Sequence, residues 1–538
     1  MLWACLRLPS LPLDVFARAL APETAARAAR RGPGREAPRG SERSRVAAGG
    51  RQLGASIEFD EAETAAQPFA VTTGGHYPRI VIANAAAYAA AVAPGQLVSA
   101  SLALAPDIVL RDRDPALEAA ALASVAGWAT QFTPTVSLAP PDAVLSEIGG
   151  SLRLFGGLRR LTAELARGAH DLGYATQLSL APTPLAALML ARAGNPGLAA
   201  SARDAHRHFG EAERATLAAA LAPLPLAHLD VAPDIVATLA AAGVTTFGEA
   251  CSLPRAPLAR RVGAGFVALL DRACGLVPDP RPPFVSPPRY EGRLELPAPV
   301  ADVEALAFAA HRLVRELAGW LAGRGLGVLE LALSLAHGRY ISTSARVALA
   351  APSREPAHLI GVLRERLARI ELPAPAEAVV LASAQVAPLA GRNLGLLPGD
   401  EAVASVPLVD RLRARLGDDA VTRIAPRAEH RPERANECDV ASPSAPGSRR
   451  SGAEADMAFP PRPVWLLAEP APLGEIVEAQ PWVLRDGPER IESGWWDGAD
   501  VRRDYFVAAT PRGELAWIYR DHRYGIDDGE WFLHGLFA

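Results

Sequence analysis

The segment Thr135-Val-Ser-Leu-Ala-Pro-Pro-Asp142-Ala143-Val-Leu-Ser-Glu147-Ile148 decides the fold of this chain. Its apolar run Val144–Ile148 predicts a short buried strand, and the Pro-Pro-Asp sequence before that strand predicts a turn. Gly149-Gly-Ser-Leu-Arg-Leu-Phe-Gly156 follows, and apolar residues at helical spacing then predict a helix over Gly157–Leu172. A strand followed by a helix is typical of an α/β layer.

Strands and helices also alternate on the N-terminal side of this segment. A strand is predicted at Leu2–Leu8, and Asp14 is predicted to be the N-cap of a helix over Asp14–Leu20. The pattern then predicts a strand at Ile80–Ala83 and helices at Ala85–Val92, Leu97–Leu104 and Pro115–Phe132. Residues 183–275 are predicted to be almost wholly helical.

The composition excludes several classes of protein. Half of the 538 residues are hydrophobic, and the chain is too long for one core, so several globular domains are expected. The net charge of −4 excludes a uniformly basic DNA-coating protein, so any nucleic-acid surface must be local. All 55 basic residues are arginine. The four cysteines form no CxxC pair, which favours a reducing cytoplasm without disulfides or zinc, and no signal or membrane segment is expected.

Five short motifs of this chain can be compared, by residue type and by order, with those of known families. They are Asn84-Ala-Ala-Ala-Tyr88, Gln131-Phe-Thr-Pro134, the Asp142 segment, Ala181-Pro-Thr-Pro184 and Gly494-Trp-Trp-Asp-Gly498. Over about residues 1–388 this order resembles the Y-family translesion DNA polymerases. The full set resembles a branch of that family that does not polymerise and belongs to a bacterial cassette for damage-induced mutagenesis in the SOS response.

The resemblance implies a multidomain α/β fold with the palm, fingers, thumb and little finger of that family. Residues 1–182 would form palm and fingers, with a disordered insertion at about 27–67 that is rich in Arg, Gly and Ser. Residues 183–277 would form a helical thumb with a helix-hairpin-helix motif, and 289–388 a βαββαβ little finger. Residues 389–426 would hold a clamp-binding hook and a helix, 427–462 a linker, and 463–538 a small Trp-rich β domain.

The metal- and nucleotide-binding residues of the family are replaced at the matching positions. The resemblance places the first-strand carboxylate at Arg7 or Pro12, keeps Asp14 and Asp142, and puts Ala143 where the family carries Glu. The fingers Tyr and Arg that hold the triphosphate match Ala85 and Tyr88, and the palm Lys matches Pro184. Phosphoryl transfer onto a primer needs paired divalent ions held by clustered carboxylates. We therefore expect no enzymatic activity and no bound metal or cofactor.

Two alternatives remain open at this stage. The first is an active Y-family DNA polymerase that holds Mg²⁺ with Asp14, Asp142 and Glu147. The second is a nucleic-acid-binding protein with no connection to a sliding clamp. For the branch that does not polymerise, the resemblance instead implies an adaptor on damaged DNA.

The expected DNA contacts of the adaptor lie in the thumb and the little finger. The family grips duplex DNA there through its backbone, without sequence preference and in a salt-sensitive way. Leu239–Val244 and Leu253–Gly263 bracket the predicted hairpin, whose backbone N–H groups could contact phosphates. The candidate side chains are Arg255, Arg260 and Arg261 of this hairpin and Arg339 between two little-finger strands.

A docking peptide for a sliding clamp is predicted after the last little-finger strand. Gly391-Arg-Asn393-Leu394-Gly395-Leu396-Leu397-Pro398 resembles the motif Gln-Leu-Ser/Asp-Leu-Phe, in which two apolar side chains fill a pocket of the clamp. Asn replaces Gln and Leu replaces Phe. Alternatively, this segment is a Leu-rich connector to the helix Val406–Leu416, and Gln385-Val-Ala-Pro388-Leu is a rival motif at a strand end.

The C-terminal region is where the resemblance places the protein partners, a RecA-related companion and an error-prone C-family DNA polymerase. Residues 464–538 hold six of the nine tryptophans and alternate apolar and polar residues like antiparallel strands. Most of these aromatic residues are expected in a core. Trp531, Phe532, Leu536 and Phe537 are the candidates for an exposed partner-binding patch.

Overall fold

The computed structural model describes residues 1–19, 67–197, 210–338, 341–389, 406–440, 462–474, 482–510, 512–522 and 530–537. These residues form two compact units, Met1–Arg415 and Leu416–Ala538. The predicted insertion at 27–67 lies outside the described residues except for Gln67, and the whole of the predicted hook, 391–398, lies outside them.

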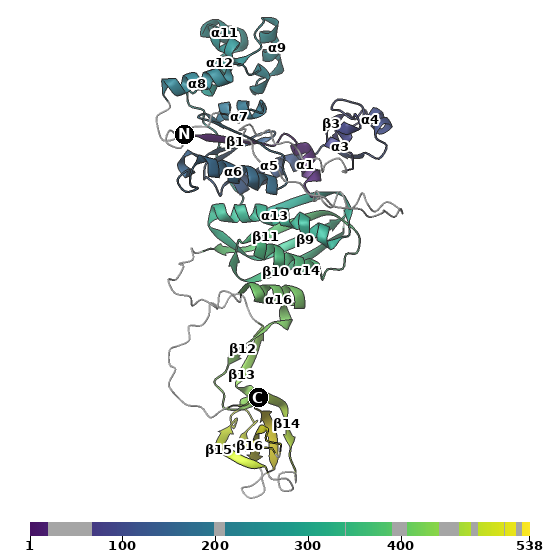
Figure 1. Cartoon of the computed structure of the whole chain (residues 1–538), viewed down its shortest axis with the longest axis vertical. Helices are drawn as coiled ribbons and strands as arrows, with labels where there is room; N and C mark the ends of the chain where they lie inside the picture. The colour runs from purple at the N-terminus through teal and green to yellow at the C-terminus, as the bar shows by residue number, and fades with distance from the viewer. Residues whose placement is uncertain are drawn as a thin grey trace, which may run out of the picture. The chain divides into compact units, whose positions relative to one another are not determined.

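The palm is a four-stranded sheet at the start of the first unit. Its strands are β5 (Val136–Ala139), β6 (Ala143–Glu147), β1 (Trp3–Arg7) and β7 (Gln177–Ala181), in that spatial order, and β1 is antiparallel to both of its neighbours. Figure 1 shows β1 between helix α7 (Pro184–Arg192) on one side and helices α5 (Pro115–Ala129) and α6 (Leu158–Asp171) on the other. The predicted strand–helix alternation of an α/β layer is confirmed here.

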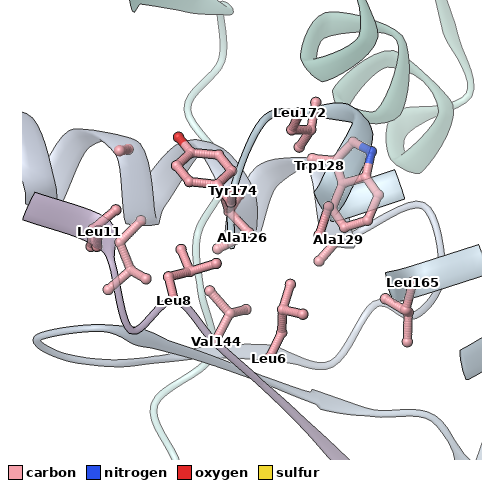
Figure 2. Packing of buried hydrophobic residues seen from close by; sticks show 14 of the residues in the cluster. Leu6, Leu8, Leu11, Ala126, Trp128, Ala129, Val144, Leu165, Leu172 and Tyr174 are labelled. Atoms are coloured by element: carbon pink, nitrogen blue, oxygen red, sulfur yellow. The ribbon is translucent and has the colours of Figure 1, made fainter. Parts of the chain in front are cut away.

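Alternation along β1 assigns its side chains to two separate cores. Leu6 and Leu8 point toward α5 and α6 and pack in one cluster with Val144 of β6, Trp128 of α5 and Leu165 of α6 (Figure 2). The residues in between point the other way, because successive side chains of a strand face opposite sides of the sheet. Cys5 and Trp3 therefore join a core that the palm shares with the thumb.

The helix after β1 begins earlier than the sequence predicts. Helix α1 spans Leu11–Ala17 with Ser10 at its N-cap, so Asp14 lies inside the helix and the predicted N-cap at Asp14 is wrong. Pro12 explains the difference, because proline is well tolerated in the first helical turn, where its missing N–H has no partner to lose.

The fingers are a three-stranded sheet with two short helices. The strands are ordered β3 (Ile80–Ala83), β2 (Phe69–Thr72) and β4 (Val109–Asp112), and the helices are α3 (Ala85–Ala89) and α4 (Val98–Leu104). The Asn84 side chain caps α3 by accepting a hydrogen bond from the Ala87 N–H at 2.9 Å. Helix α3 thus begins as predicted and ends three residues earlier.

The described residues of the thumb are mostly helical, as predicted. Its helices are α7 (Pro184–Arg192), α8 (Glu211–Leu221), α9 (Pro233–Ala241), α10 (Phe247–Ser252), α11 (Arg255–Val262) and α12 (Ala264–Ala273). Helix α7 packs against β1 and β7 of the palm. The successive pairs α9–α10 and α11–α12 supply the predicted helix-hairpin-helix arrangement.

The little finger has the predicted βαββαβ order. Strands β8 (Glu291–Val300), β9 (Leu326–His337), β10 (Ile341–Ser353) and β11 (Ala376–Pro388) form an antiparallel sheet ordered β10-β9-β11-β8. Helices α13 (Val303–Arg324) and α14 (Pro356–Leu367) cover one face of this sheet (Figure 1). Helix α16 (Val406–Leu416) follows, and its Asp410 accepts hydrogen bonds from the Ala350 N–H at 2.8 Å and interacts with His358 at 2.9 Å.

Palm and little finger also contact each other through α5 and α13. Gly319 of α13 lies against the Trp128 ring, and a Cβ atom there would come within 2.3 Å of it. Beside this contact, Arg18 and Glu316 form a buried ion pair with 3.1 Å between Nη1 and Oε2, and the Tyr290 hydroxyl donates to the same carboxylate at 3.0 Å. A proline-rich segment, residues 278–288, connects the thumb to the little finger. It runs beside the palm edge, where the Phe284 N–H donates to the Val136 carbonyl at 2.7 Å.

The second unit begins earlier than the predicted boundary at residue 463. Strands β12 (Thr422–Pro426) and β13 (Asn436–Val440) form a hairpin within residues that the sequence assigns in part to a linker. Arg431 of this hairpin is buried and pairs with Asp497 at 2.7 Å. The predicted linker 427–462 is therefore too long at its N-terminal end, because a polar segment is held in place by ion pairs to distant residues.

The rest of the second unit is a five-stranded antiparallel sheet. Its order is β14 (Trp465–Pro472), β18 (Trp531–Leu536), β17 (Leu515–Asp521), β16 (Val501–Ala509) and β15 (Val483–Ser493). Tyr505 and Trp517 stack at 4.0 Å in its centre. The predicted small β-rich domain is present.

Candidate functional site

The palm places an arginine where the resemblance puts the first-strand carboxylate. Arg7 ends β1 and is aligned with Ala143 of β6 and Gln177 of β7. Its Nε donates to Asp142 Oδ2 at 2.7 Å, and its Nη1 donates to Gln177 Oε1 at 3.2 Å. A guanidinium group thus occupies this end of the sheet and is paired with the acidic residue of the turn.

Ala143 is fully buried beside this ion pair. It belongs to the core that the palm shares with the thumb, together with Cys5, Leu145 and Leu185. The position that carries Glu in the resembling family is therefore part of an apolar core in this chain, with no room for a solvated carboxylate.

Asp14 and Glu147 are committed to other contacts. Asp14 Oδ2 accepts a hydrogen bond from the Ala175 N–H at 3.1 Å, and burial raises the pKa of Asp14 to about 7. Glu147 Oε1 accepts from the N–H groups of Leu2 at 3.0 Å and Gly149 at 3.1 Å. Glu147 is the register partner of Trp3, whereas Ala143 is the register partner of Arg7. Glu147 is therefore four residues along the strand from the position opposite Arg7, a distance of roughly 13 Å at the usual strand rise.

These carboxylates do not fit the magnesium pair that a polymerase fold implies. Hard divalent cations need several oxygen ligands around one point. Asp142 is paired with Arg7, and Glu147 is at the far end of its strand. Within the described part of the chain, no group of three or more His, Cys, Asp or Glu residues is placed to hold a metal ion.

The three positions matched to the family's nucleotide-binding residues carry no cationic side chain for a triphosphate. Ala85 and Tyr88 both lie on the exposed side of α3. Pro184 is the first residue of α7 and is buried, with Thr183 as the N-cap residue before it. The side chain of Thr183 donates to the Ala273 carbonyl at 3.0 Å, so the start of α7 is engaged with the thumb.

Two of the three arginines predicted in the thumb form no ion pair with another described residue. Arg260 and Arg261 are exposed in the last turn of α11. Next to them α12 begins after Gly263, with no side chain capping its first N–H groups, and such N–H groups attract anions. Arg255 is different, because its Nη2 pairs with Asp271 at 3.0 Å and the residue is half-buried.

The other hairpin of the thumb offers fewer donors. Glu249 Oε2 accepts hydrogen bonds from the N–H groups of Thr245 at 2.7 Å and Thr246 at 2.9 Å. A carboxylate thus occupies the place where the backbone of this hairpin could meet a phosphate. The α11–α12 junction is the better candidate for the DNA contact.

The open face of the little-finger sheet is nearly neutral. Two cross-strand rows on it are Ser344-Ser334-Val380-Arg293 and Arg346-Ala332-Ala382-Glu291. Both arginines form ion pairs, Arg293 with Glu295 at 2.6 Å and Arg346 with Glu330 at 3.4 Å. The predicted contact Arg339 lies outside the described residues, as do Asn393, Leu394, Gly395, Leu396 and Leu397 of the predicted hook.

The four candidate partner residues of the second unit differ in exposure. Phe532 stacks on Tyr519 at 5.2 Å, Trp531 packs against Phe506 at 5.5 Å, and Phe537 is half-buried against the same core as Phe532. Leu536 is the exposed one of the four. Sequence reasoning missed a more exposed aromatic pair, Trp495 and Trp496, which are 80 % and 57 % exposed in the turn between β15 and β16. The Gly494-Trp-Trp-Asp-Gly498 sequence could have indicated this exposed pair, because glycines on both sides of the tryptophans favour a turn.

No helix among the described residues is long and apolar enough to cross a membrane.

The chain is similar to several known proteins. Residues 54–192 match the model of the impB/mucB/samB family. The chain is 31 % identical over 482 residues to Protein ImuB from two strains of Caulobacter vibrioides, NA1000 / CB15N and ATCC 19089 / CIP 103742 / CB 15, covering 83 % of this chain and 99 % of each relative. A ternary complex of Dbh covers 71 % of this chain at 12 % identity with a TM-score of 0.35, and 98 % of that structure is covered. DinB from Sulfolobus solfataricus has the same coverage and identity, with a TM-score of 0.33.

Proposed function

Because this chain belongs to the ImuB family of Y-family polymerase-like proteins, we propose that it is a non-catalytic adaptor in damage-induced translesion synthesis and mutagenesis. The observation that carries the proposal is the ion pair of Arg7 with Asp142 at the end of β1. A guanidinium cannot be deprotonated in a protein, so its positive charge persists at this place. A divalent cation there would be repelled by Arg7 and would have to compete with it for Asp142.

The buried Ala143 supports the same proposal. A second carboxylate at this position would have to enter an apolar core, so the site has no simple route to a second ligand. Ala85, Tyr88 and Pro184 supply no cation for the phosphates of an incoming nucleotide. Asp14 and Glu147 are held by backbone N–H groups elsewhere.

The adaptor would bind primer-template DNA weakly and without sequence preference. Arg260, Arg261 and the free start of α12 supply the contacts of the thumb. The described part of the little-finger face adds little net positive charge, which is why we propose weak binding.

The adaptor would reach its protein partners through two separate segments. Residues 391–398 would hook a sliding clamp. Residues on both sides of this segment contact the little finger. Before it, the Leu389 N–H donates to the Gly325 carbonyl at 3.0 Å. After it, Asp410 accepts a hydrogen bond from the Ala350 N–H at 2.8 Å. The second unit would dock an ImuA-like RecA-related protein and an error-prone C-family DNA polymerase.

A primer-extension assay tests the non-catalytic role. The purified chain with Mg²⁺ or Mn²⁺, primer-template DNA and all four nucleotides should extend no primer. An active Y-family DNA polymerase is the competing function, and extension that Asp142→Ala abolishes would establish it in place of ours.

Capture of a purified sliding clamp tests the hook. The wild-type chain should retain the clamp, and the triple variant Leu394→Ala, Leu396→Ala, Leu397→Ala should release it. A matched variant with Leu408→Ala and Leu412→Ala changes exposed leucines of α16 and should keep clamp binding. Equal retention by the triple variant would refute the hook.

A further inference from the structure

A cavity lies between the palm and the little finger, and its volume is about 410 Å³. Its palm wall is formed by the C-terminal end of α1, the C-terminal end of α6 and the loop that follows α6. Its little-finger wall is one side of α13. The basic and aromatic side chains that line it include Arg18, Tyr174, Phe308, His311, Arg312 and Arg315.

Three guanidinium groups approach this palm–little finger cavity from its two walls. Arg18 follows α1, and Arg312 and Arg315 are about one turn apart on α13. The Arg312 guanidinium lies against the backbone of Gly173 in the palm loop, where a Cβ atom would overlap its Nη1. Gly173, with a φ of +88°, therefore leaves the space that this guanidinium needs.

The carboxylates around the cavity balance these charges only in part. Arg18 pairs with Glu316 at 3.1 Å between Nη1 and Oε2. Arg315 pairs with Asp171 in the same way. The remaining carboxyl group in the lining is that of Asp14, and burial raises its pKa to about 7, so it is only partly ionised near neutral pH. A positive charge therefore remains on the α13 side of the cavity.

The groups that line the cavity carry costs that an anion would reduce. Burial, and then the charge of Arg18, lower the pKa of Arg312 to about 10, so the two guanidinium groups repel each other. Tyr174 and Arg18 are 1 % and 5 % exposed, and the Tyr174 hydroxyl and the Arg18 Nε have no hydrogen-bond partner among the described residues. Buried polar groups without partners cost free energy. An anion bound between the two walls would offset the repulsion and supply acceptors.

The arrangement favours a phosphate ester over other anions. A tetrahedral phosphate offers acceptor oxygens in several directions, as guanidinium groups on two walls require, whereas a carboxylate offers two oxygens in one plane. The Phe308 ring centroid lies 5.1 Å from the Arg312 Cζ, so an aromatic surface adjoins the charged group. The cavity is also larger than a phosphate ion, which leaves room for an organic group beside this ring.

We propose that the palm–little finger cavity binds a small phosphate ester of about the size of a mononucleotide. Arg312 and Arg315 hold the phosphate, and Phe308 contacts the organic group. The ligand touches both walls, so its binding strengthens the contact between palm and little finger. The site depends neither on a metal ion in the palm nor on DNA binding by the thumb, and its test is independent of both.

Isothermal titration calorimetry with the full-length chain tests the proposal. The probes are deoxyadenosine 5′-monophosphate, inorganic phosphate and deoxyadenosine. The monophosphate should bind more tightly than inorganic phosphate, and deoxyadenosine should not bind, because it lacks the anion. A DNA duplex with a 5′-phosphate is a second source of the same chemistry. This duplex should leave the affinity for the monophosphate unchanged.

Variants locate the binding site. Arg312→Met should weaken binding of the monophosphate at least about tenfold. The melting temperature of this variant without ligand should be no lower than that of the wild type, because the repulsion from Arg18 is removed, whereas loss of a merely structural arginine would lower it. Arg315→Gln, at a side chain that is 40 % exposed, should weaken binding as well. Arg159→Met is the matched control, because Arg159 is exposed near the opposite end of α6, and it should bind like the wild type.

Three results would overturn the proposal. The first is a wild-type chain that binds neither inorganic phosphate nor the monophosphate. The second is binding of the 5′-phosphorylated duplex in place of the monophosphate. The third is undiminished binding in Arg315→Gln and Arg312→Met, and Arg315→Gln alone decides this point if Arg312→Met does not fold.

Discussion

The palm and the thumb share one apolar core but differ in the polar groups above it. Cys5 and Ala143 of the palm sheet pack in the same cluster as Leu185 and Phe266 of the thumb helices. At its polar end the palm pairs one arginine with one aspartate. The thumb instead leaves Arg260 and Arg261 exposed next to an uncapped helix start.

The difference teaches that the fold and the site depend on different residues. Strand β1 lies between β6 and β7, and Leu6, Leu8 and Cys5 pack in the two cores beside this sheet. None of these three apolar residues is a candidate metal ligand. Replacing the residues that hold a metal therefore leaves the sheet intact. Binding of a DNA backbone needs only arginines and free N–H groups, so the DNA contact that we propose for the thumb does not depend on a metal ion in the palm.

The largest expected effect comes from restoring the acidic residue that the palm lacks. Ala143→Glu would place a carboxylate at a fully buried position beside Arg7, which already pairs with Asp142, and it would displace apolar contacts of the shared core. We expect a loss of several kcal/mol, at least about 3 kcal/mol, in the free energy of unfolding. Chemical denaturation monitored by circular dichroism measures this loss.

Gln177→Glu is the matched control for that substitution. It adds a carboxylate at the same level of the sheet, in a half-buried position where Arg7 already donates to Gln177. It should change the stability by less than about 1 kcal/mol. If Ala143→Glu proved as mild as Gln177→Glu and bound Mn²⁺, the contrast between palm and thumb would disappear.

The next effect concerns DNA binding by the thumb. Arg260→Ala with Arg261→Ala should weaken binding of a primer-template duplex by about tenfold or more at low salt, because two phosphate contacts are removed. The slope of log affinity against log salt should fall by about 2. Fluorescence anisotropy over a salt series provides both values.

A pair of arginines on the palm supplies the control for this experiment. Arg159 and Arg160 are adjacent and exposed on α6, as Arg260 and Arg261 are on α11. Changing both to alanine removes the same charge and should leave the affinity nearly unchanged. Equal losses from the two double variants would show that net charge, and not the thumb surface, governs the binding.

The helices and strands of the palm and the little finger could be predicted from local apolar patterns. Contacts between residues far apart in the chain could not be predicted. The strand at Val144–Ile148 and the βαββαβ order follow from local apolar patterns. The pairing of Arg7 with Asp142 could not be predicted, because it depends on the register of two strands that lie 135 residues apart. Arg431 presents the same problem, since a polar segment resembles a linker until its ion pair with Asp497 is known.

A pH-dependent effect follows from the buried carboxyl group of the palm. Burial raises the pKa of Asp14 from 3.8 to about 7, against the opposing influence of the Ala175 N–H and of Arg18 and Arg312. Between these two pH values the unfolded chain loses a proton that the folded chain keeps, so stability falls as pH rises and levels off above pH 7. Asp14→Asn keeps an acceptor for Ala175 and removes this loss.

Thermal or chemical unfolding across pH 4 to 8 measures that difference. At pH 8 the Asp14→Asn variant should be more stable than the wild type by about 4 kcal/mol, and the two should converge toward pH 4. Asp271→Asn in the thumb is the control, because Asp271 is paired with Arg255 and should give no gain at high pH. A gain that does not depend on pH would contradict the raised pKa.

The smallest expected effect compares the two ion pairs themselves. The Arg7–Asp142 side chains are 24 % and 16 % exposed, and the Arg255–Asp271 side chains are 39 % and 26 % exposed. Less water around a pair strengthens its attraction, so the palm pair should show the larger coupling energy, about 1 kcal/mol against about 0.5 kcal/mol. Double-mutant cycles with Arg→Gln and Asp→Asn measure both values, and raised salt should reduce the thumb value more. If the palm coupling were zero, Arg7 would not hold Asp142, and the aspartate would be available to a metal ion after all.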